Sequence, residues 1–154
     1  MPPAARPADF AVTLRFRAGS MPPPHHYRTR TELGADGSGT ITTTIGYGSD
    51  GPTRDAAFAL GDAEMDALHA DLDALGLFET PWAEAPRERR AIGGALTAVE
   101  AVADGRSVRV PARVRGDQRD ARDAIVERVR AAVPEATAAA VRSWRSETQA
   151  APRR

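Results

Sequence analysis

The sequence predicts an α+β domain in which an antiparallel sheet carries two or three helices on one face. Several segments alternate apolar and polar residues, two later segments have the spacing of amphipathic helices, and short turns join neighbouring strands. Strands joined by short turns pair antiparallel, and helices of such folds gather on one face. We therefore expect the order β-β-β-(β)-α-β-β-α-(α), where parentheses mark a short fourth strand and a third helix.

Length and composition predict one domain without disulfide or metal staples. A chain of 154 residues can bury a hydrophobic core, and the absence of cysteine excludes disulfides, thiol nucleophiles and iron–sulfur clusters. Residues 9–146 are the expected domain, and the ends at 1–8 and 147–154 are expected to be disordered. No apolar segment approaches the length of a membrane span, which favours a soluble, cytoplasmic protein without a membrane partner.

The charge balance does not indicate a nucleic-acid partner. The formal net charge is zero, and all 21 basic residues are arginines. The lack of lysine beside abundant alanine is typical of a GC-rich bacterium. An arginine in this chain therefore does not by itself indicate phosphate or carboxylate recognition.

Strand periodicity dominates the first part of the chain. Apolar or threonine residues recur at every second position, so one face of each strand is expected to be buried. A three-residue loop at 36–38 would place Leu33 opposite Ile41 and keep the apolar faces together. The strands are expected at 9–17, 25–33 and 40–47, with a short fourth strand at 56–60.

The clearest helix follows at 62–76. Asp62 is the expected N-cap, acidic residues occupy the first turn, and Gly76 is the expected C-terminal stop. The expected buried stripe consists of Met65, Leu68, Leu72 and Leu75.

A hairpin and a second helix complete the predicted domain. The hairpin turns at Asp104 and the glycine after it, which sets Val99 opposite Val110. A second amphipathic helix ends near residue 133, and Pro134 either ends that helix or begins a third one.

One glycine motif resembles a cofactor site but lacks its context. The stretch GYGSDG at 46–51 matches the G-x-G-x-x-G pattern of dinucleotide-binding proteins. That mechanism requires a helix to begin inside the motif, and here a proline follows it instead. We interpret the motif as a glycine-rich turn and expect no cofactor.

A metal site on the first helix is an alternative hypothesis. Asp62, Asp66, His69 and Asp73 recur at steps of four, three and four, which places them in one stripe. No H-E-x-x-H spacing or second ligand set accompanies them. We therefore interpret the stripe as a solvated acidic flank. The alternative, a metal-binding protein or metal-dependent enzyme, requires His69 to face one of the other two histidines.

Four arginines form one candidate interaction surface. Arg15, Arg17, Arg28 and Arg30 are expected to project from the polar face of two neighbouring strands. We interpret this face first as the solvent side of the sheet. As a cationic surface, it is also the best candidate for contact with an acidic partner.

The proline-rich segment at 19–26 extends that surface. Three successive prolines favour a stiff polyproline-II arm that a partner can bind at little entropic cost. His25 and His26 begin a strand and are expected on opposite faces, His25 at the edge of the core and His26 at the surface. The expected partner-binding residues of this segment are Met21, Pro22, Pro23, Pro24 and His26.

Several segments together resemble a known family. FAVTLRFRAGS resembles the opening strand and turn of emfourin-like proteins, small inhibitors of thermolysin-type metallopeptidases. LDALGLF, IGGALTAVEAVADGRSVRVP and ARDAIVERV are similar to that family's later parts, so the resemblance covers most of 10–133. It departs at TITTTIGYGSDGPTRDAAFAL and at SMPPPHHY. The resemblance implies an α+β fold, a non-enzymatic protein and inhibition of a peptidase.

These observations favour a non-catalytic binding domain. No G-x-S-x-G elbow is present and only three histidines could act as a base, so we expect no enzymatic activity. The expected partner is another protein, and one version of this hypothesis is a peptidase inhibitor. A structural or assembly subunit, including a homo-oligomer, is a further alternative.

Overall fold

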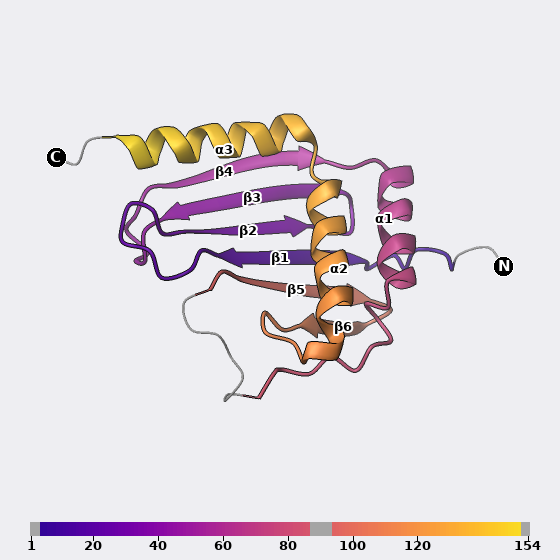
Figure 1. Ribbon diagram of the computed structural model, residues 1–154. Helices are drawn as coiled ribbons and strands as arrows, with labels where there is room; N and C mark the ends of the chain where they lie inside the picture. The colour runs from indigo at the N-terminus through magenta and orange to yellow at the C-terminus, as the bar shows by residue number, and fades with distance from the viewer. Residues whose placement is uncertain (1–3, 87–93, 152–154) are drawn as a thin grey trace.

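Six strands form one antiparallel sheet in the computed structural model, which describes residues 4–86 and 94–151 (Figure 1). The strands are β1 Ala11–Arg17, β2 Tyr27–Leu33, β3 Ser38–Ile45, β4 Thr53–Ala59, β5 Leu96–Ala103 and β6 Arg106–Val110. Their order across the sheet is β4-β3-β2-β1-β5-β6, and every neighbouring pair is antiparallel.

In the described part of the chain, three α-helices lie on one face of the sheet (Figure 1). They are α1 Asp62–Ala74, α2 Arg119–Ala132 and α3 Glu135–Ala150. A short 3-10 helix, Gly116–Gln118, precedes α2. The predicted α+β class and element order are confirmed, including the fourth strand and the third helix. Pro134 begins that third helix. The N-cap of α1 is Gly61 rather than Asp62, and the Gly61 N–H donates to the Glu64 carboxylate at 2.9 Å.

The core lies between the inner face of the sheet and the first two helices. Because side chains alternate along a strand, Val12 and Leu14 of β1 point inward and the residues between them point away. Leu68 and Leu72 of α1 and Ile125 of α2 cover the sheet and are fully buried. The remaining members of this cluster are Phe10, Leu33, Leu60, Met65, Leu77, Val99, Ala101, Val110, Val114, Val126 and Val129.

The β2–β3 pairing differs from the predicted register by two residues. Leu33 lies opposite Gly39, not Ile41. Gly37 has φ of +86° and closes a three-residue loop at positions 35–37, because the left-handed position that ends such a loop favours glycine. A shift of two residues preserves the inward and outward faces, so the predicted burial of Ile41 and Leu33 holds.

The β5–β6 hairpin has the predicted register. Val99 lies opposite Val110, and the turn is at Asp104 and the residue after it. The ion pair of Glu100 is formed with Arg15 of the neighbouring β1, at 3.8 Å.

Regular structure or ion pairs extend into both predicted ends. Helix α3 continues to Ala150, past the expected domain boundary at residue 146. Near the N-terminus, Arg6 pairs with Asp62 at 3.2 Å and with Asp66 at 3.4 Å. Residues 1–3 and 152–154 lie outside the described part of the chain. Within the described part, no helix has the length and apolar character needed to cross a membrane.

Candidate binding surfaces

The proline loop, residues 19–26, is fastened to a neighbouring loop by a tyrosine. It joins β1 to β2 and lies at the same end of the sheet as the loop from β3 to β4 (Figure 1). The Tyr47 hydroxyl donates to the Met21 carbonyl at 2.7 Å and accepts the Met21 N–H at 3.1 Å. Both polar groups of one backbone residue are therefore held by one side chain.

The conformation of the three prolines differs from the predicted extended arm. The His25 N–H donates to the Pro22 carbonyl at 2.9 Å, so residues 22–25 form a turn, and the Pro23–Pro24 peptide bond is cis. A cis proline at the third position is the arrangement of a type VI turn. The loop is compact rather than extended.

The prediction that His26 is a surface residue is wrong. Its side chain is only 1% exposed, whereas His25 is exposed. The imidazole stacks on the Tyr47 ring with centroids 3.7 Å apart and an angle of 6°, and its Nδ1 lies 3.2 Å from the Gly19 carbonyl oxygen. The strand begins only at Tyr27, so its alternation does not extend back to the histidines.

Apolar side chains remain exposed at the tip of this fastened loop. Met21 is 44% exposed and Tyr47 is 46% exposed, which is unusual for large hydrophobic residues in this protein. Pro22 and Pro23 are exposed beside them, and Pro24 is half-buried. The tip therefore offers an apolar contact area on a backbone that is already ordered.

The four arginines on β1 and β2 share the face that carries no helix. Arg15 lies opposite Arg30, and Arg17 lies opposite Arg28. Their charges are largely engaged, since Arg15 pairs with Glu100 at 3.8 Å and Arg30 pairs with Glu32 at 2.5 Å. Arg28 donates to two backbone carbonyls of the loop after β3, at 3.1 and 3.2 Å. This face is a mixed charged surface rather than a purely cationic one.

The proposed metal ligands on α1 are not brought together. His69 is buried between Phe10 and Phe78, with ring centroids at 5.0 and 5.7 Å. Asp62, Asp66 and Asp73 are exposed, and the first two pair with Arg6. The α1 helix also lies at the end of the sheet opposite the proline loop (Figure 1). Among the described residues, no group of three or more His, Asp or Glu side chains could hold a metal ion.

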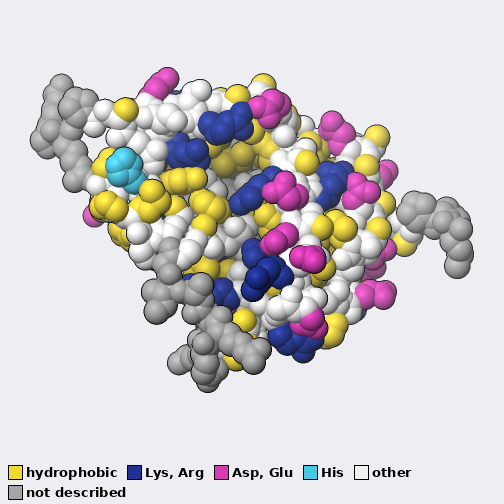
Figure 2. All heavy atoms as spheres, in the orientation of Figure 1, with side chains coloured by type: hydrophobic (Ala, Val, Ile, Leu, Met, Phe, Trp, Pro, Cys, Tyr) yellow, Lys and Arg dark blue, Asp and Glu magenta, His cyan; other side chains and the backbone are white. Residues whose placement is uncertain are grey.

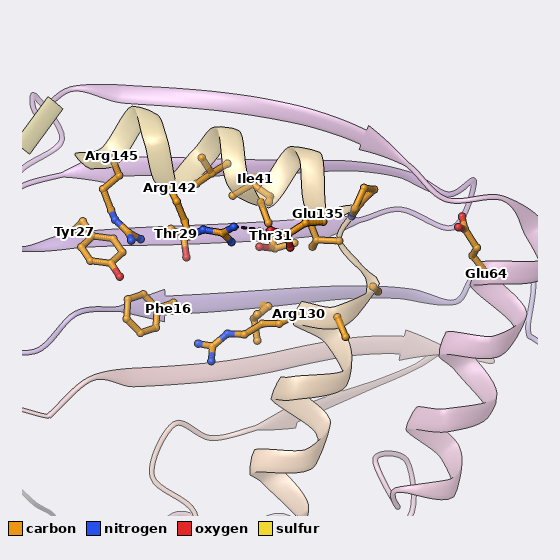
Figure 3. Close-up of a pocket in the computed structure, with 17 residues that line it drawn as sticks. Phe16, Tyr27, Thr29, Thr31, Ile41, Glu64, Arg130, Glu135, Arg142 and Arg145 are labelled. Carbon is orange, nitrogen blue, oxygen red and sulfur yellow. Dashed lines mark hydrogen bonds and ion pairs between the residues drawn. The ribbon is translucent and has the colours of Figure 1, made fainter. Parts of the chain in front are cut away.

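A groove on the helix face was not predicted from the sequence. It has a volume of about 780 Å³ and lies between the sheet, the C-terminal end of α2 and α3 (Figure 3). Helix α3 packs against β3 and β4, and none of its residues, all of which are described, is fully buried. The floor of the groove is formed by Leu14, Phe16, Tyr27, Thr29, Thr31 and Ile41.

Arginines from two helices border the groove. The Arg145 guanidinium lies 4.3 Å from the Tyr27 ring centroid, and that of Arg130 lies 5.7 Å from the Phe16 centroid. The two rings are neighbours, 5.4 Å apart. In Figure 2, hydrophobic side chains are visible on this face beside several basic side chains, with acidic side chains among them. Phe16 and Tyr27 are half-exposed. Alternation alone would place them in the core, because they occupy the same strand face as the buried apolar residues.

Comparisons with known proteins give no family assignment. No family model matches the chain, and no curated protein matches it.

Proposed function

We propose that this chain is a non-catalytic protein-binding domain that docks through the proline loop and Tyr47. The observation that carries this proposal is the double hydrogen bond between the Tyr47 hydroxyl and the Met21 backbone, beneath a tip whose apolar side chains stay exposed. A side chain that orders a loop and leaves its tip open to solvent prepares that loop for contact.

Preorganisation is the physical basis of the proposal. Binding costs free energy for each loop and side chain that must be ordered, and a loop ordered beforehand avoids part of that cost. The buried His26 beneath Tyr47 and the turn at 22–25 hold the loop at two further points. Exposed tyrosine and methionine are also residue types that are enriched at protein interfaces.

The partner to test first is a thermolysin-type metallopeptidase. The resemblance of several segments to emfourin-like inhibitors supports this choice, and inhibitors that dock by an ordered loop change little on binding. The inhibitory activity is thus one specific form of the protein-binding proposal.

The experiment is a titration of thermolysin activity against a peptide substrate with the purified full-length chain. The expected result is a saturable loss of activity at micromolar or lower concentration. Undiminished activity at micromolar excess would overturn the inhibitor proposal. Recovery of the intact chain after incubation, checked by mass spectrometry, distinguishes an inhibitor from a competing substrate, which would be cleaved.

A further inference from the structure

We propose that the groove beneath α3 binds a small amphiphilic anion, with one carboxylate-type head and an apolar body. This site is separate from the proline loop and does not depend on the proposed protein-binding function. It combines an apolar floor on the sheet with guanidinium groups from α2 and α3, and Figure 3 shows the side chains of Arg130 and Arg145 reaching toward the Phe16–Tyr27 pair from opposite sides.

The size and lining of the groove fit a small molecule. A volume of about 780 Å³ falls within the range of roughly 300–1,000 Å³ that is usual for such sites, which are mostly apolar with a few polar groups. Phe16 and Tyr27 supply aromatic surface, and Leu14 and Ile41 continue the apolar floor. The hydroxyl groups of two threonines are the polar part of that floor.

The charges at one end of the groove select an anion. Arg145 forms no ion pair with any described residue. The ion pair of Arg130 with Glu127 is long, at 3.9 Å, and the Glu127 side chain is 78% exposed. Arg142 is already neutralised by Glu135 at 2.6 Å. The Phe16–Tyr27 end therefore carries two guanidinium groups without a close carboxylate partner among the described residues.

These two guanidinium groups border the same pair of aromatic rings. Each lies over an aromatic ring, which holds it near the apolar surface and limits its hydration on that side. A carboxylate placed between them would accept charge-assisted hydrogen bonds, the strongest kind in proteins. Among the described residues that line the groove, two are acidic: Glu135, and Glu64 of α1 at the far end (Figure 3).

A single anionic head fits the groove better than an acidic peptide. The available cations cluster at one end. The rest of the floor is apolar apart from the two threonines, and no other unpaired cation lines it within the described part of the chain. A bound ligand would also fill the space under α3, whose inner side chains are only half-buried. Because a ligand that binds the folded state stabilises it, binding should raise the melting temperature.

The test uses decanoate as the probe, with the purified full-length chain in isothermal titration calorimetry and thermal melting. Decyltrimethylammonium, which has an apolar chain of nearly the same length and a cationic head, is the matched ligand control. We expect decanoate to bind one site and raise the melting temperature, and the cation to do neither. The Arg145→Gln variant should weaken decanoate binding by about tenfold, since it loses a charged hydrogen-bond donor.

The matched protein control is Arg109→Gln. Arg109 is an exposed arginine on the opposite face of the sheet, so this variant should bind decanoate as the wild type does. Melting curves without ligand establish that both variants are folded. The proposal is overturned if decanoate does not bind the wild type, if Arg145→Gln binds it equally well, or if the cation binds as tightly. Tight binding of an Asp- and Glu-rich peptide that displaces decanoate would replace the proposal with a peptide site.

Discussion

The ring of Phe58 on β4 occupies the space above Gly39 on β3 that a side chain at position 39 would need. These residues are direct partners in the β3–β4 ladder, and a Cβ added at Gly39 would overlap three atoms of the Phe58 ring. Phe58 packs against the hydrophobic core from this edge position. The glycine therefore allows an edge strand to contribute an aromatic side chain to the core.

Replacing Gly39 by alanine should destabilise the fold. The Phe58 ring would have to leave its position, and overpacking of this kind costs about 1–3 kcal/mol. Chemical denaturation measures the free energy of unfolding. Gly116→Ala is the matched control, because nothing lies within 4 Å of a Cβ at that position. An equal effect of both substitutions would contradict the role assigned to the Phe58 contact.

The Tyr47→Phe variant should loosen the proline loop and leave the fold intact. Phenylalanine keeps the ring that stacks on His26 but removes both hydrogen bonds to Met21. We expect faster hydrogen exchange at the Met21 amide and a loss of about 1 kcal/mol in unfolding free energy. Tyr27→Phe is the control, since the Tyr27 hydroxyl bonds to no described residue. Unchanged exchange at Met21 in Tyr47→Phe would show that the tyrosine does not order the loop.

The protein should become less stable as the pH is lowered, in part because the Asp9 carboxylate becomes protonated. The N–H groups of Gly105 and Asp104 donate to its carboxylate at 2.7 and 2.8 Å and hold the pKa of Asp9 below its ordinary value. A carboxylate whose pKa is lowered in the folded state stabilises the fold at pH values above its ordinary pKa, near 4. This stabilisation is lost as the pH falls through the pKa of the folded state.

The Asp9→Asn variant should therefore lose less stability than the wild type between pH 6 and about pH 3. Denaturation curves at several pH values measure this difference in slope. Asp36 and Asp117 also have pKa values lowered by hydrogen bonds, so some slope should remain in the variant. Identical slopes for the wild type and Asp9→Asn would contradict the assignment to Asp9.

Substitution of His69 by leucine should preserve or raise stability. The His69 side chain is buried, and its Nδ1 has no hydrogen-bond partner among the described residues. Removing an unsatisfied buried polar atom relieves its desolvation penalty. Thermal and chemical denaturation provide the measurement, with and without added Zn²⁺. A loss above about 2 kcal/mol would contradict this prediction. Stabilisation of the wild type alone by zinc would support the metal-binding alternative.

The sequence predicts the layout of this fold better than its local geometry. Alternation locates β1, β2 and β3, because each of these strands buries one face. The edge strand β4 has no buried residue and begins at Thr53, three residues before the predicted start. The same periodicity preserves the faces even where the β2–β3 register is displaced. The β2–β3 register depends on which glycine takes the left-handed position in the loop between the strands. Gly37 takes it, but by residue type Gly39 fits that position equally well. His26 is misplaced for a similar reason, since its burial comes from Tyr47 on another loop.

The groove escapes prediction because it depends on how widely the helices are spaced. Phe16 and Tyr27 have the pattern of core residues, and only the position of α3 over β3 and β4 leaves them partly open. The arginines above them come from two helices that are far from β1 and β2 in sequence. Arginine replaces lysine throughout this chain. An arginine in the sequence therefore does not by itself indicate contact with an aromatic ring.

The most direct test of the central claim compares two single substitutions in binding to thermolysin. Met21→Asp places a charge on the tip of the proline loop, and Val102→Asp places one on a comparable exposed apolar residue of β5, with 36% exposure. Binding is measured by calorimetry under identical conditions. The account predicts that Met21→Asp weakens binding by at least about tenfold while Val102→Asp binds as the wild type does. Equal affinities of the two variants would show that the proline loop is not the docking surface.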